Sequence, residues 1–470
     1  MIKFGKQLEH YIKRRNLTIK SAAEMFGMDR ATLHKILSGQ RKLKNEQTLE
    51  SISEALMLTS DEYSDLLKKY RIGLMGEDVF ERRNKVSDVI SYLSENEQNK
   101  VLLDYHMTEE DELEELPEVM VVNEHLALLK NISTLLMKER LEGGDVLFIA
   151  QPSAMLNEII FNVCTDEGSG YVKHIFCMDN NCSESCANEY NLDILKYVCK
   201  MSSLKQKYIP QYYYDNAAGC FSQGALLSDT IITDHFFIKL DNKFNEGVFC
   251  SNEAAVKLYR QKAEVLESRS HAFLYPVDGF KSLIDYYYEL NTLDYIYYYQ
   301  PCMVFASPDD IMRKYMRMPK EIEGTFLAKM GEFKSAAISR SVIDIFSEAG
   351  LKEFMETGLI AEVPDVLYER PALEDRKSIL RNMIYLAESD VFRYRILKPE
   401  LCSYEKGFHM HGTSELLKVS PAKNEPQNMT FVNIREKSIL NAFKDYINYL
   451  IESDLTYSKS ETIDILKKYL

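Results

Sequence analysis

Residues 17–43, LTIKSAAEMFGMDRATLHKILSGQRKL, decide the fold of the N-terminal region. The hydroxyl of Thr18 can cap a short helix, and Gly27 supplies a turn residue after that helix. Asp29 can then cap a further helix over residues 30–37. The stretch therefore predicts two helices joined by a tight turn.

The helix expected over residues 30–37 has an inner and an outer side. Leu33, Ile36 and Leu37 recur at helical spacing and should face the core. The outward positions are Arg30, Ala31, Thr32, His34 and Lys35. The residues that follow, 38–42, indicate a helix stop and a basic loop. A helix with this outer side is a candidate recognition helix.

Three further helices are predicted around this pair. One apolar stripe gives a helix that ends near Asn16, with the members Phe4, Leu8, Tyr11 and Ile12. Another stripe gives a fourth helix, with the members Leu49, Ile52, Ala55 and Leu56. Thr59 and Glu62 fit a capping box that opens a fifth helix through about Tyr70. Residues 1–72 are therefore predicted to form an all-α bundle.

Charge is segregated along the chain. The whole sequence carries a net charge of −15. Residues 1–72 contain 14 lysines and arginines against 9 acidic residues, a net charge of +5, which leaves −20 for residues 73–470. Phosphates attract the first region and repel the second. If the chain binds DNA, it should do so through its N-terminal end.

The quoted stretch resembles the phage-repressor and Cro type of helix-turn-helix, the XRE-like family of bacterial regulators, over about residues 4–70. In that family the start of the third helix enters the major groove, and the loop after it touches the phosphate backbone. The chain has Ile19 where the family often has glutamine, so that contact is not carried over. The DNA-binding residues implied are Thr18, Lys20, Arg30, Ala31, Thr32, His34, Lys35, Arg41 and Lys42.

Arg30 is the base-reading residue we would test first, because arginine can bind guanine O6 and N7 in a bidentate manner. The structural alternative is a helical bundle whose surface charges are only solvated. The combination of turn chemistry, five helices and local positive charge favours DNA binding.

Residues 73–118 are expected to link this domain to the rest of the chain. A partial apolar stripe predicts a long helix over about residues 76–103, which could pair with a second copy or pack on the body of its own chain. The acidic run over residues 109–115, closed by Pro117, indicates a boundary loop.

Beyond residue 118 the pattern alternates between helices and strands, which predicts a large mixed α/β body. We expect one α/β half over residues 119–275, a tyrosine-rich helical connector over 276–310, and a second half with C-terminal helices over 311–470. In each half a strand, a polar turn, a second strand and a capped helix follow one another, and this order indicates two related halves.

The strand-turn-strand-helix ending resembles the phospholipase-D-like fold, which also occurs as a non-catalytic effector domain. Its enzymes need a His-x-Lys motif, because histidine forms the phospho-enzyme bond and lysine holds the phosphate. The nearest residues here, His235 with Lys239 and His409 with His411, have the wrong spacing. The resemblance therefore implies a body that has lost this chemistry.

One cysteine cluster could hold a metal or act as a thiol sensor, since thiolates and imidazole are zinc ligands. Its members are His174, Cys177, Cys182, Cys186 and Cys199. No pair has the two-residue gap of a zinc knuckle, and cysteine is a common core residue, so we expect no metal. With nine cysteines and no export signal, reduced thiols are the default.

Two other groups have a structural and a functional interpretation. His409 and His411 share one strand face, which could supply two ligands but is more commonly a solvated sheet face. Tyrosines at 212–214, 295 and 297–299 could line a pocket for a planar ligand, although buried or half-buried packing is the commoner outcome.

The sequence thus predicts a cytoplasmic, sequence-specific transcriptional regulator that is not an enzyme, needs no cofactor and contains no membrane span. Its partners would be a double-stranded DNA operator, a second copy of the chain, and a small-molecule or protein effector. One alternative is an antitoxin-like or phage-type switch whose body binds a protein. Another is an enzymatic body that the N-terminal domain targets to DNA.

Overall fold

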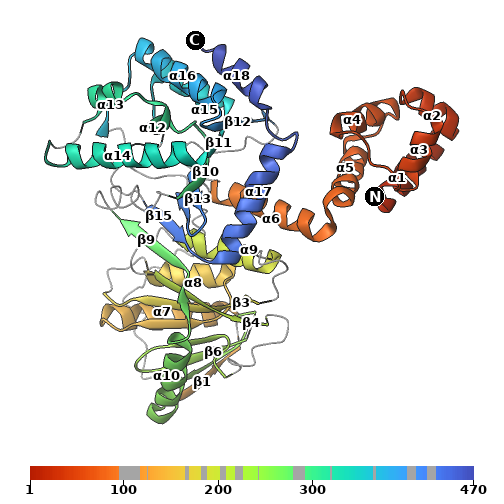
Figure 1. The fold of residues 1–470 in the computed structure, drawn as a ribbon. Coiled ribbons are helices and arrows are strands. Elements are labelled where there is room, and N and C mark those ends of the chain that lie inside the picture. Colours follow the sequence, from red (N-terminus) through yellow and green to blue (C-terminus); the bar gives the residue numbers. More distant parts are fainter. Residues whose placement is uncertain are drawn as a thin grey trace. The chain divides into compact units, whose positions relative to one another are not determined.

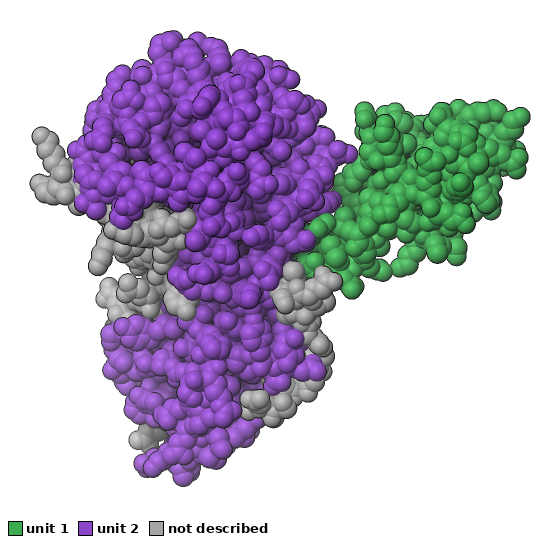
Figure 2. Space-filling view, viewed as in Figure 1, with its two compact units in different colours: residues 1–85 green, residues 86–470 purple. Residues whose placement is uncertain are grey.

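The computed structural model describes residues 1–94, 117–123, 125–164, 169–180, 188–201, 208–216, 226–241, 243–278, 292–317, 320–361, 363, 367–399, 409–420 and 430–470 (Figure 1). The chain divides into two compact units, Met1–Lys85 and Val86–Leu470 (Figure 2). The first is all-helical and the second combines sheets with helices, which confirms the predicted multi-domain architecture. Among the described helices, none is both long and apolar enough to cross a membrane.

The first unit is a bundle whose helices are α1 (Ile2–Arg14), α2 (Ile19–Met25), α3 (Arg30–Leu37), α4 (Glu46–Ala55) and α5 (Ser60–Met75), followed by the start of α6 (Glu77–Ser94). The expected caps are present: the side chains of Thr18, Asp29 and Thr59 each accept a hydrogen bond from the first turn of their helix. Gly27 has a φ of +65°, which the turn between α2 and α3 requires.

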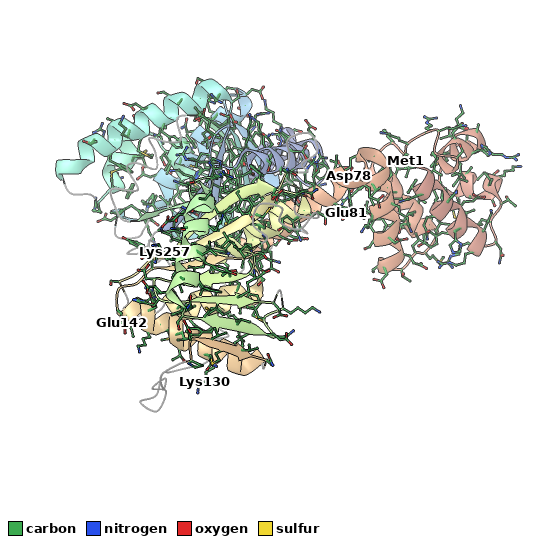
Figure 3. The ribbon with its side chains drawn as sticks, turned by 90° about the horizontal axis from the view of Figure 1, so that it is seen from below. Met1, Asp78, Glu81, Lys130, Glu142 and Lys257 are labelled. Carbon is green, nitrogen blue, oxygen red and sulfur yellow. The ribbon has the colours of Figure 1, made fainter. Side chains whose placement is uncertain are left out.

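This unit extends beyond the predicted limit at residue 72. Helix α5 continues to Met75, and the first turns of α6 are tied to the bundle. Glu77 pairs with Lys3, and Glu81, which projects from α6 in Figure 3, pairs with Lys68. The linking helix expected over about residues 76–103 is helical as far as the structure describes it, up to Ser94; its remaining part and the predicted acidic loop over 109–115 lie outside the described residues.

The second unit contains two mixed sheets. Sheet A has the strand order β1-β7-β6-β5-β2-β3-β4-β8, and sheet B has the order β12-β11-β10-β13-β14-β15-β9. The strands of sheet A are β1 (Val119–Val122), β2 (Val146–Ile149), β3 (Val172–Asp179), β4 (Tyr208–Asp215), β5 (Thr230–Ile232), β6 (Phe237–Leu240), β7 (Gly247–Cys250) and β8 (His271–Ala272). Those of sheet B are β9 (Leu274–Asp278), β10 (Leu293–Tyr298), β11 (Ile343–Ser347), β12 (Arg393–Leu397), β13 (His409–Thr413), β14 (Leu417–Ser420) and β15 (Thr430–Ile434).

Helices cover both faces of sheet A, so its strands are buried on either side. One face packs against α7 (His125–Leu141), α8 (Ala154–Cys164) and α9 (Glu189–Lys200). The other face packs against α10 (Glu253–Glu267) through Val256, Ala263 and Leu266.

Sheet B is enclosed in the same way. One face packs against α17 (Lys437–Glu452), within a core that is continuous with the α7–α9 side of sheet A. The opposite face packs against α12 (Met303–Ala306), α13 (Asp309–Tyr315), α14 (Lys320–Arg340), α15 (Glu348–Thr357), α16 (Leu373–Glu388) and α18 (Lys459–Lys467).

The two sheets repeat one topology. We call the part that carries β1–β7 and α10 half 1, and the part that carries β9–β15 and α17 half 2. In each half three parallel strands are followed by three antiparallel strands that return on the other side of the first parallel strand. Each half also has a strand that comes before these six in the sequence and pairs with the last of them: β1 pairs with β7, and β9 pairs with β15.

The pairing registers of the two halves coincide as well. Equivalent residues of half 1 and half 2 are Leu147 and Tyr295, Lys173 and Ile343, Ile232 and Gly412, Phe237 and Leu417, and Cys250 and Ile434. Helices α10 and α17 each begin three residues after the last member of this series. The correspondence therefore continues along both helices.

The same turn joins the fifth and sixth strands of the two series. The hydroxyl of Thr233 accepts hydrogen bonds from the backbone N–H groups of residues 235 and 236, at 3.2 and 3.1 Å. The hydroxyl of Thr413 accepts from the N–H groups of residues 415 and 416, at 3.1 and 2.9 Å. Half 2 thus repeats a side-chain motif of half 1 as well as its strand order.

The tyrosine-rich stretch differs from expectation. The sequence predicted a helical connector over residues 276–310; residues 279–291 lie outside the described residues, α12 and the start of α13 are helical, but β9 reaches Asp278 and β10 covers Leu293–Tyr298. Tyr295, Tyr297 and Tyr298 are buried on the two covered faces of the sheet, where aromatic side chains favour a strand. The second set of strands therefore begins earlier than residue 310.

Candidate nucleic-acid interface

Helix α3 holds its first turn with a chain of side-chain hydrogen bonds. The Asp29 carboxylate accepts from the backbone N–H of Thr32 at 2.8 Å and from the Thr32 hydroxyl at 2.7 Å. The Arg41 guanidinium donates to that same hydroxyl at 3.0 Å. The hydrogen bonds from Thr32 hold the pKa of Asp29 below its ordinary value, so this cap stays ionised at neutral pH.

The position of α3 in the bundle is fixed by a close helix crossing. A Cβ atom on Gly5 of α1 would lie 2.1 Å from the carbonyl oxygen of Leu37, so only glycine allows this approach. Leu33, Ile36 and Leu37 are buried against the core, as the sequence predicted. The outer side of α3 is thereby held in one orientation.

The residues assigned to DNA binding form an accessible set. Thr32 is partly buried, and the others are exposed: Thr18, Lys20, Arg30, Ala31, His34, Lys35, Arg41 and Lys42. Thr18 and Thr32 both use their hydroxyl groups within the bundle, Thr18 as the cap of α2 and Thr32 between Asp29 and Arg41. The side chains that remain available to a nucleic acid are those of Lys20, Arg30, Ala31, His34, Lys35 and Lys42.

Ion pairs divide the basic residues of the first unit into two groups. Those on α1 and α5 that pair with a carboxylate are Lys3, Lys13, Arg14, Lys68, Lys69 and Arg71. Those on α2, α3 and the loop after α3, namely Lys20, Arg30, Lys35, Lys42 and Lys44, form no ion pair with any residue that the structure describes. Positive charge is consequently in excess around α3, where residues 19–44 carry six basic side chains against the two carboxylates of Glu24 and Asp29.

The pair between Arg14 and Glu62 shows how the other side of the bundle is neutralised. Arg14 bonds both oxygens of the Glu62 carboxylate, whose pKa this contact and a backbone hydrogen bond from Thr59 lower to about 2. Both charges are therefore present at neutral pH and cancel locally. Lys44, which sequence analysis did not single out, belongs to the group without an ion pair. Its lack of a carboxylate partner could not be predicted from the sequence, because ion pairs depend on the fold.

The cysteine cluster does not form one site. His174 and Cys177 are three residues apart on β3, so their side chains point to opposite faces of sheet A. Cys177 packs on the α10 side, whereas His174 and Cys199 pack on the α7–α9 side. Burial raises the pKa of the Cys177 thiol to about 11 and that of Cys199 further, so both are inert neutral thiols at pH 7. Cys182 and Cys186 lie outside the described residues.

The other histidine candidates have structural partners. His235 contacts the carboxylate of Glu139 at 2.9 Å. His409 and His411 are buried, although a solvated face was the expected setting, because β13 is a central strand of a sheet covered on both faces. The Nε2 atom of His411 lies 3.1 Å from the hydroxyl oxygen of Tyr298. Among the described residues, no group of three or more histidine, cysteine or acidic side chains could hold a metal ion.

The tyrosine runs are mostly packing residues. Tyr213, Tyr295, Tyr297 and Tyr298 are buried, Tyr212 is half-buried and Tyr214 is exposed. This distribution matches the packing interpretation given to these residues from the sequence.

Comparison with known proteins gives no family for the chain. No family model and no curated protein matches it. Among solved structures it is similar to TrmBL2, an archaeal chromatin protein with a novel mode of DNA binding, at 16% identity over 49% of this chain and 73% of that chain, with a TM-score of 0.22. It is also similar to the polyphosphate kinase of Porphyromonas gingivalis, at 9% identity over 67% of this chain and 47% of that chain, with a TM-score of 0.21. Scores this low carry no argument about the function.

Proposed function

We propose that the first unit binds double-stranded DNA in a sequence-specific manner through α3 and the loop that follows it. The observation that carries this proposal is the division of the basic residues: six of those on α1 and α5 pair with carboxylates, whereas Lys20, Arg30, Lys35, Lys42 and Lys44 around α3 form no ion pair with a described residue. A phosphate backbone is the partner that such a surface attracts, and a helix of this kind fits the major groove. The chain would then act as a transcriptional regulator.

Base reading is assigned to Arg30, because it stands at the first position of α3, is exposed and has no internal partner among the described residues. Ala31, His34 and Lys35 would accompany it in the groove. Arg41 is assigned two roles. Its guanidinium donates a hydrogen bond to Thr32, and its place in the loop after α3 is where phosphate contacts are expected.

The test is a selection of DNA by the full chain from a randomised duplex library, followed by fluorescence anisotropy on the enriched sequence. Arg30→Ala should weaken binding by roughly 1–3 kcal/mol and relax the preference at one base position. Lys42→Ala should weaken all sequences alike and reduce the salt dependence by about one counterion. Lys13→Ala is the control. Lys13 lies on α1 and its charge is already paired with Glu9, so this variant should leave the affinity within about twofold.

Two results would refute the proposal. One is the failure of any sequence to be enriched over the starting library. The other is an Arg30→Ala variant that keeps both the affinity and the sequence preference of the unchanged chain.

We also propose that the body regulates this binding by sensing a signal or by oligomerisation, and that it does not catalyse a reaction. The partners of His235 and the burial of His409 and His411 support a structural role for the histidines that could have been catalytic. Helix-turn-helix proteins of this type read two half-sites as dimers, so a homodimer is expected. Light scattering of the full chain with and without the selected DNA measures this directly.

A further inference from the structure

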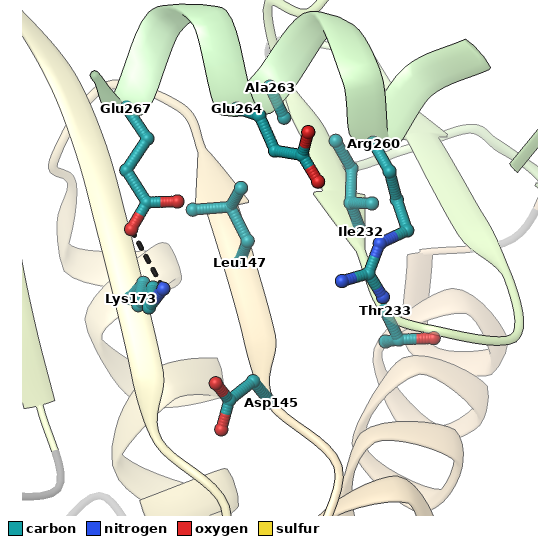
Figure 4. Close-up of a pocket in the computed structure, with 9 residues that line it drawn as sticks. All are labelled: Asp145, Leu147, Lys173, Ile232, Thr233, Arg260, Ala263, Glu264 and Glu267. Carbon is teal, nitrogen blue, oxygen red and sulfur yellow. Dashed lines mark hydrogen bonds and ion pairs between the residues drawn. The ribbon is translucent and has the colours of Figure 1, made fainter. Parts of the chain in front are cut away.

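A small cavity lies between α10 and sheet A in half 1 (Figure 4). Its volume is about 70 Å³, which is room for about five water-sized groups. Its apolar floor consists of Leu147 on β2, Ile232 on β5 and Ala263 on α10. Thr233 adds a wall, but its hydroxyl is already engaged in the turn described above. The cavity can therefore take a ligand only a few atoms long.

Charged side chains surround this floor. Arg260, Glu264 and Glu267 project from one side of α10, at the helical spacing that faces the sheet. Lys173 on β3 and Asp145 before β2 come from the sheet. The cavity thus carries both signs of charge within a small volume.

Two of these carboxylates are available to a ligand. Lys173 is held by Glu267, with 2.7 Å between its Nζ and a carboxylate oxygen, and Arg260 is paired with Asp234 outside the cavity. Asp145 and Glu264 form no ion pair with any described residue, although one oxygen of Asp145 accepts a hydrogen bond from the backbone N–H of Tyr171 at 2.9 Å. Figure 4 shows Asp145 entering from the sheet and Glu264 from the helix above it. A positively charged group in the cavity would be attracted by both carboxylates.

Half 2 shows what the same space becomes when it is not a cavity. The ring of Tyr295, equivalent to Leu147, covers Gly412, equivalent to Ile232; a Cβ on Gly412 would lie 1.9 Å from the ring. The positions equivalent to Lys173 and Glu267 are Ile343 and Ile451. Half 2 fills the floor of this space with apolar side chains and keeps polar groups, Lys444 and Asn448, only at the helix positions equivalent to Arg260 and Glu264; half 1 keeps the space open.

The geometry points to a binding site in half 1 for a small zwitterion of the size of glycine or alanine. Its ammonium group would be attracted by the carboxylates of Asp145 and Glu264, and its carboxylate would be shared by Arg260 and Lys173, which keep their pairs with Asp234 and Glu267. The short aliphatic part would rest on Leu147, Ile232 and Ala263. This site does not depend on the DNA-binding proposal, because it belongs entirely to the second unit.

Isothermal titration calorimetry of the full chain tests the site with glycine, L-alanine, methylamine and acetate. Glycine or alanine should bind saturably, and methylamine and acetate, which each lack one charge, should bind at least about tenfold more weakly. Glu264→Gln and Asp145→Asn should each weaken amino-acid binding by about tenfold or more. Glu253→Gln, on the same helix but outside the cavity, should leave the binding unchanged.

A filling variant provides an independent check. Leu147→Tyr combined with Ile232→Gly copies half 2 and should abolish binding while circular dichroism shows the fold retained. Glu264 is exposed, so Glu264→Gln remains informative even if another variant fails to fold. The site is overturned if neither amino acid binds, if acetate binds as well as glycine, or if Glu264→Gln binds like the unchanged chain.

Discussion

In half 1 the space under the last helix is lined with charged side chains, whereas in half 2 the ring of Tyr295 occupies the equivalent space above Gly412. The backbones around these two spaces have the same strand order and register, and the turns at Thr233 and Thr413 use the same hydrogen bonds. The frame is therefore set by strand pairing and turn chemistry. The side chains inside it differ between the two halves.

A second contrast runs across the other face of the two sheets. In half 1 one row of paired strand positions is mostly apolar and consists of His174, Phe148, Ile231, Ile238 and Phe249. The equivalent row in half 2 consists of Asp344, Ile296, His411, Lys418 and Asn433. Both rows are buried. Half 2 thus has four polar side chains in this row, where half 1 has only His174. Half 1 instead has its charged side chains on the opposite face of its sheet, beneath α10.

The largest expected effect comes from Gly412→Ala, which removes the room that Tyr295 occupies. The added Cβ would lie 1.9 Å from a buried ring, so the ring must move and the core of half 2 must open. Overpacking of this kind costs about 3 kcal/mol. Urea unfolding followed by tyrosine fluorescence measures it, because 27 of the 30 tyrosines lie beyond residue 85.

Gly331→Ala is the matched control for this change. Gly331 lies inside α14, and no atom within 4 Å would meet its added Cβ. Because alanine is the better helix former, stability should rise by up to about 1 kcal/mol. An unchanged urea midpoint for Gly412→Ala would mean that the ring does not need this space, and the contrast between the two halves would fail.

The next effect concerns His174, the one ionisable member of the buried row in half 1. Its Nε2 atom lies 3.0 Å from the carbonyl oxygen of Ala150, and its Nδ1 atom lies 2.8 Å from the hydroxyl of Tyr208. A neutral ring satisfies both by donating from Nε2 and accepting at Nδ1. Burial lowers the pKa of this imidazole from 6.5 to about 4. The folded chain therefore holds His174 neutral where the unfolded chain would protonate it.

The sign of the pH dependence follows from this shift. Between pH 6.5 and pH 4 the unfolded state binds the extra proton, so stability falls as the pH falls and is fully present only above 6.5. At pH 5 the loss from this group is about 2 kcal/mol relative to pH 8. His174→Gln should remove that part of the difference between the urea midpoints at the two pH values. His10→Gln, which changes an exposed histidine on α1, should retain it; equal losses in both variants would exclude the buried imidazole as the cause.

Local chemistry made much of the first unit predictable from sequence. The caps at Thr18 and Asp29 and the turn at Gly27 involve residues within four positions of one another, and the helix expected over 30–37 is α3 without change. Elements that carry their own start and stop signals can be found without knowledge of the fold.

Features that depend on pairing between distant strands were missed. The run around Tyr295 has no clear period-2 pattern because both faces of β10 are buried, so it was assigned to a helix. The cavity beneath α10 joins Asp145, Lys173 and Glu264, which the register of sheet A and the helix crossing bring together. By contrast, the spacing of three between His174 and Cys177 already placed them on opposite faces of a strand, and it could have excluded the cysteine site from sequence alone.

The smallest expected effect tests what the two halves share. Thr233→Val and Thr413→Val each remove a hydroxyl that accepts two backbone N–H groups in a turn, and each keeps the shape of the side chain. Both hydroxyl positions are buried, so each variant should lose about 1–2 kcal/mol of unfolding free energy. The matching serine variants keep the hydroxyl and should recover most of that loss. If the two turns are equivalent, the two valine variants will be destabilised to the same extent. A loss confined to one of them would show that the turn stabilises only one half. The similarity between the halves would then be one of strand order alone.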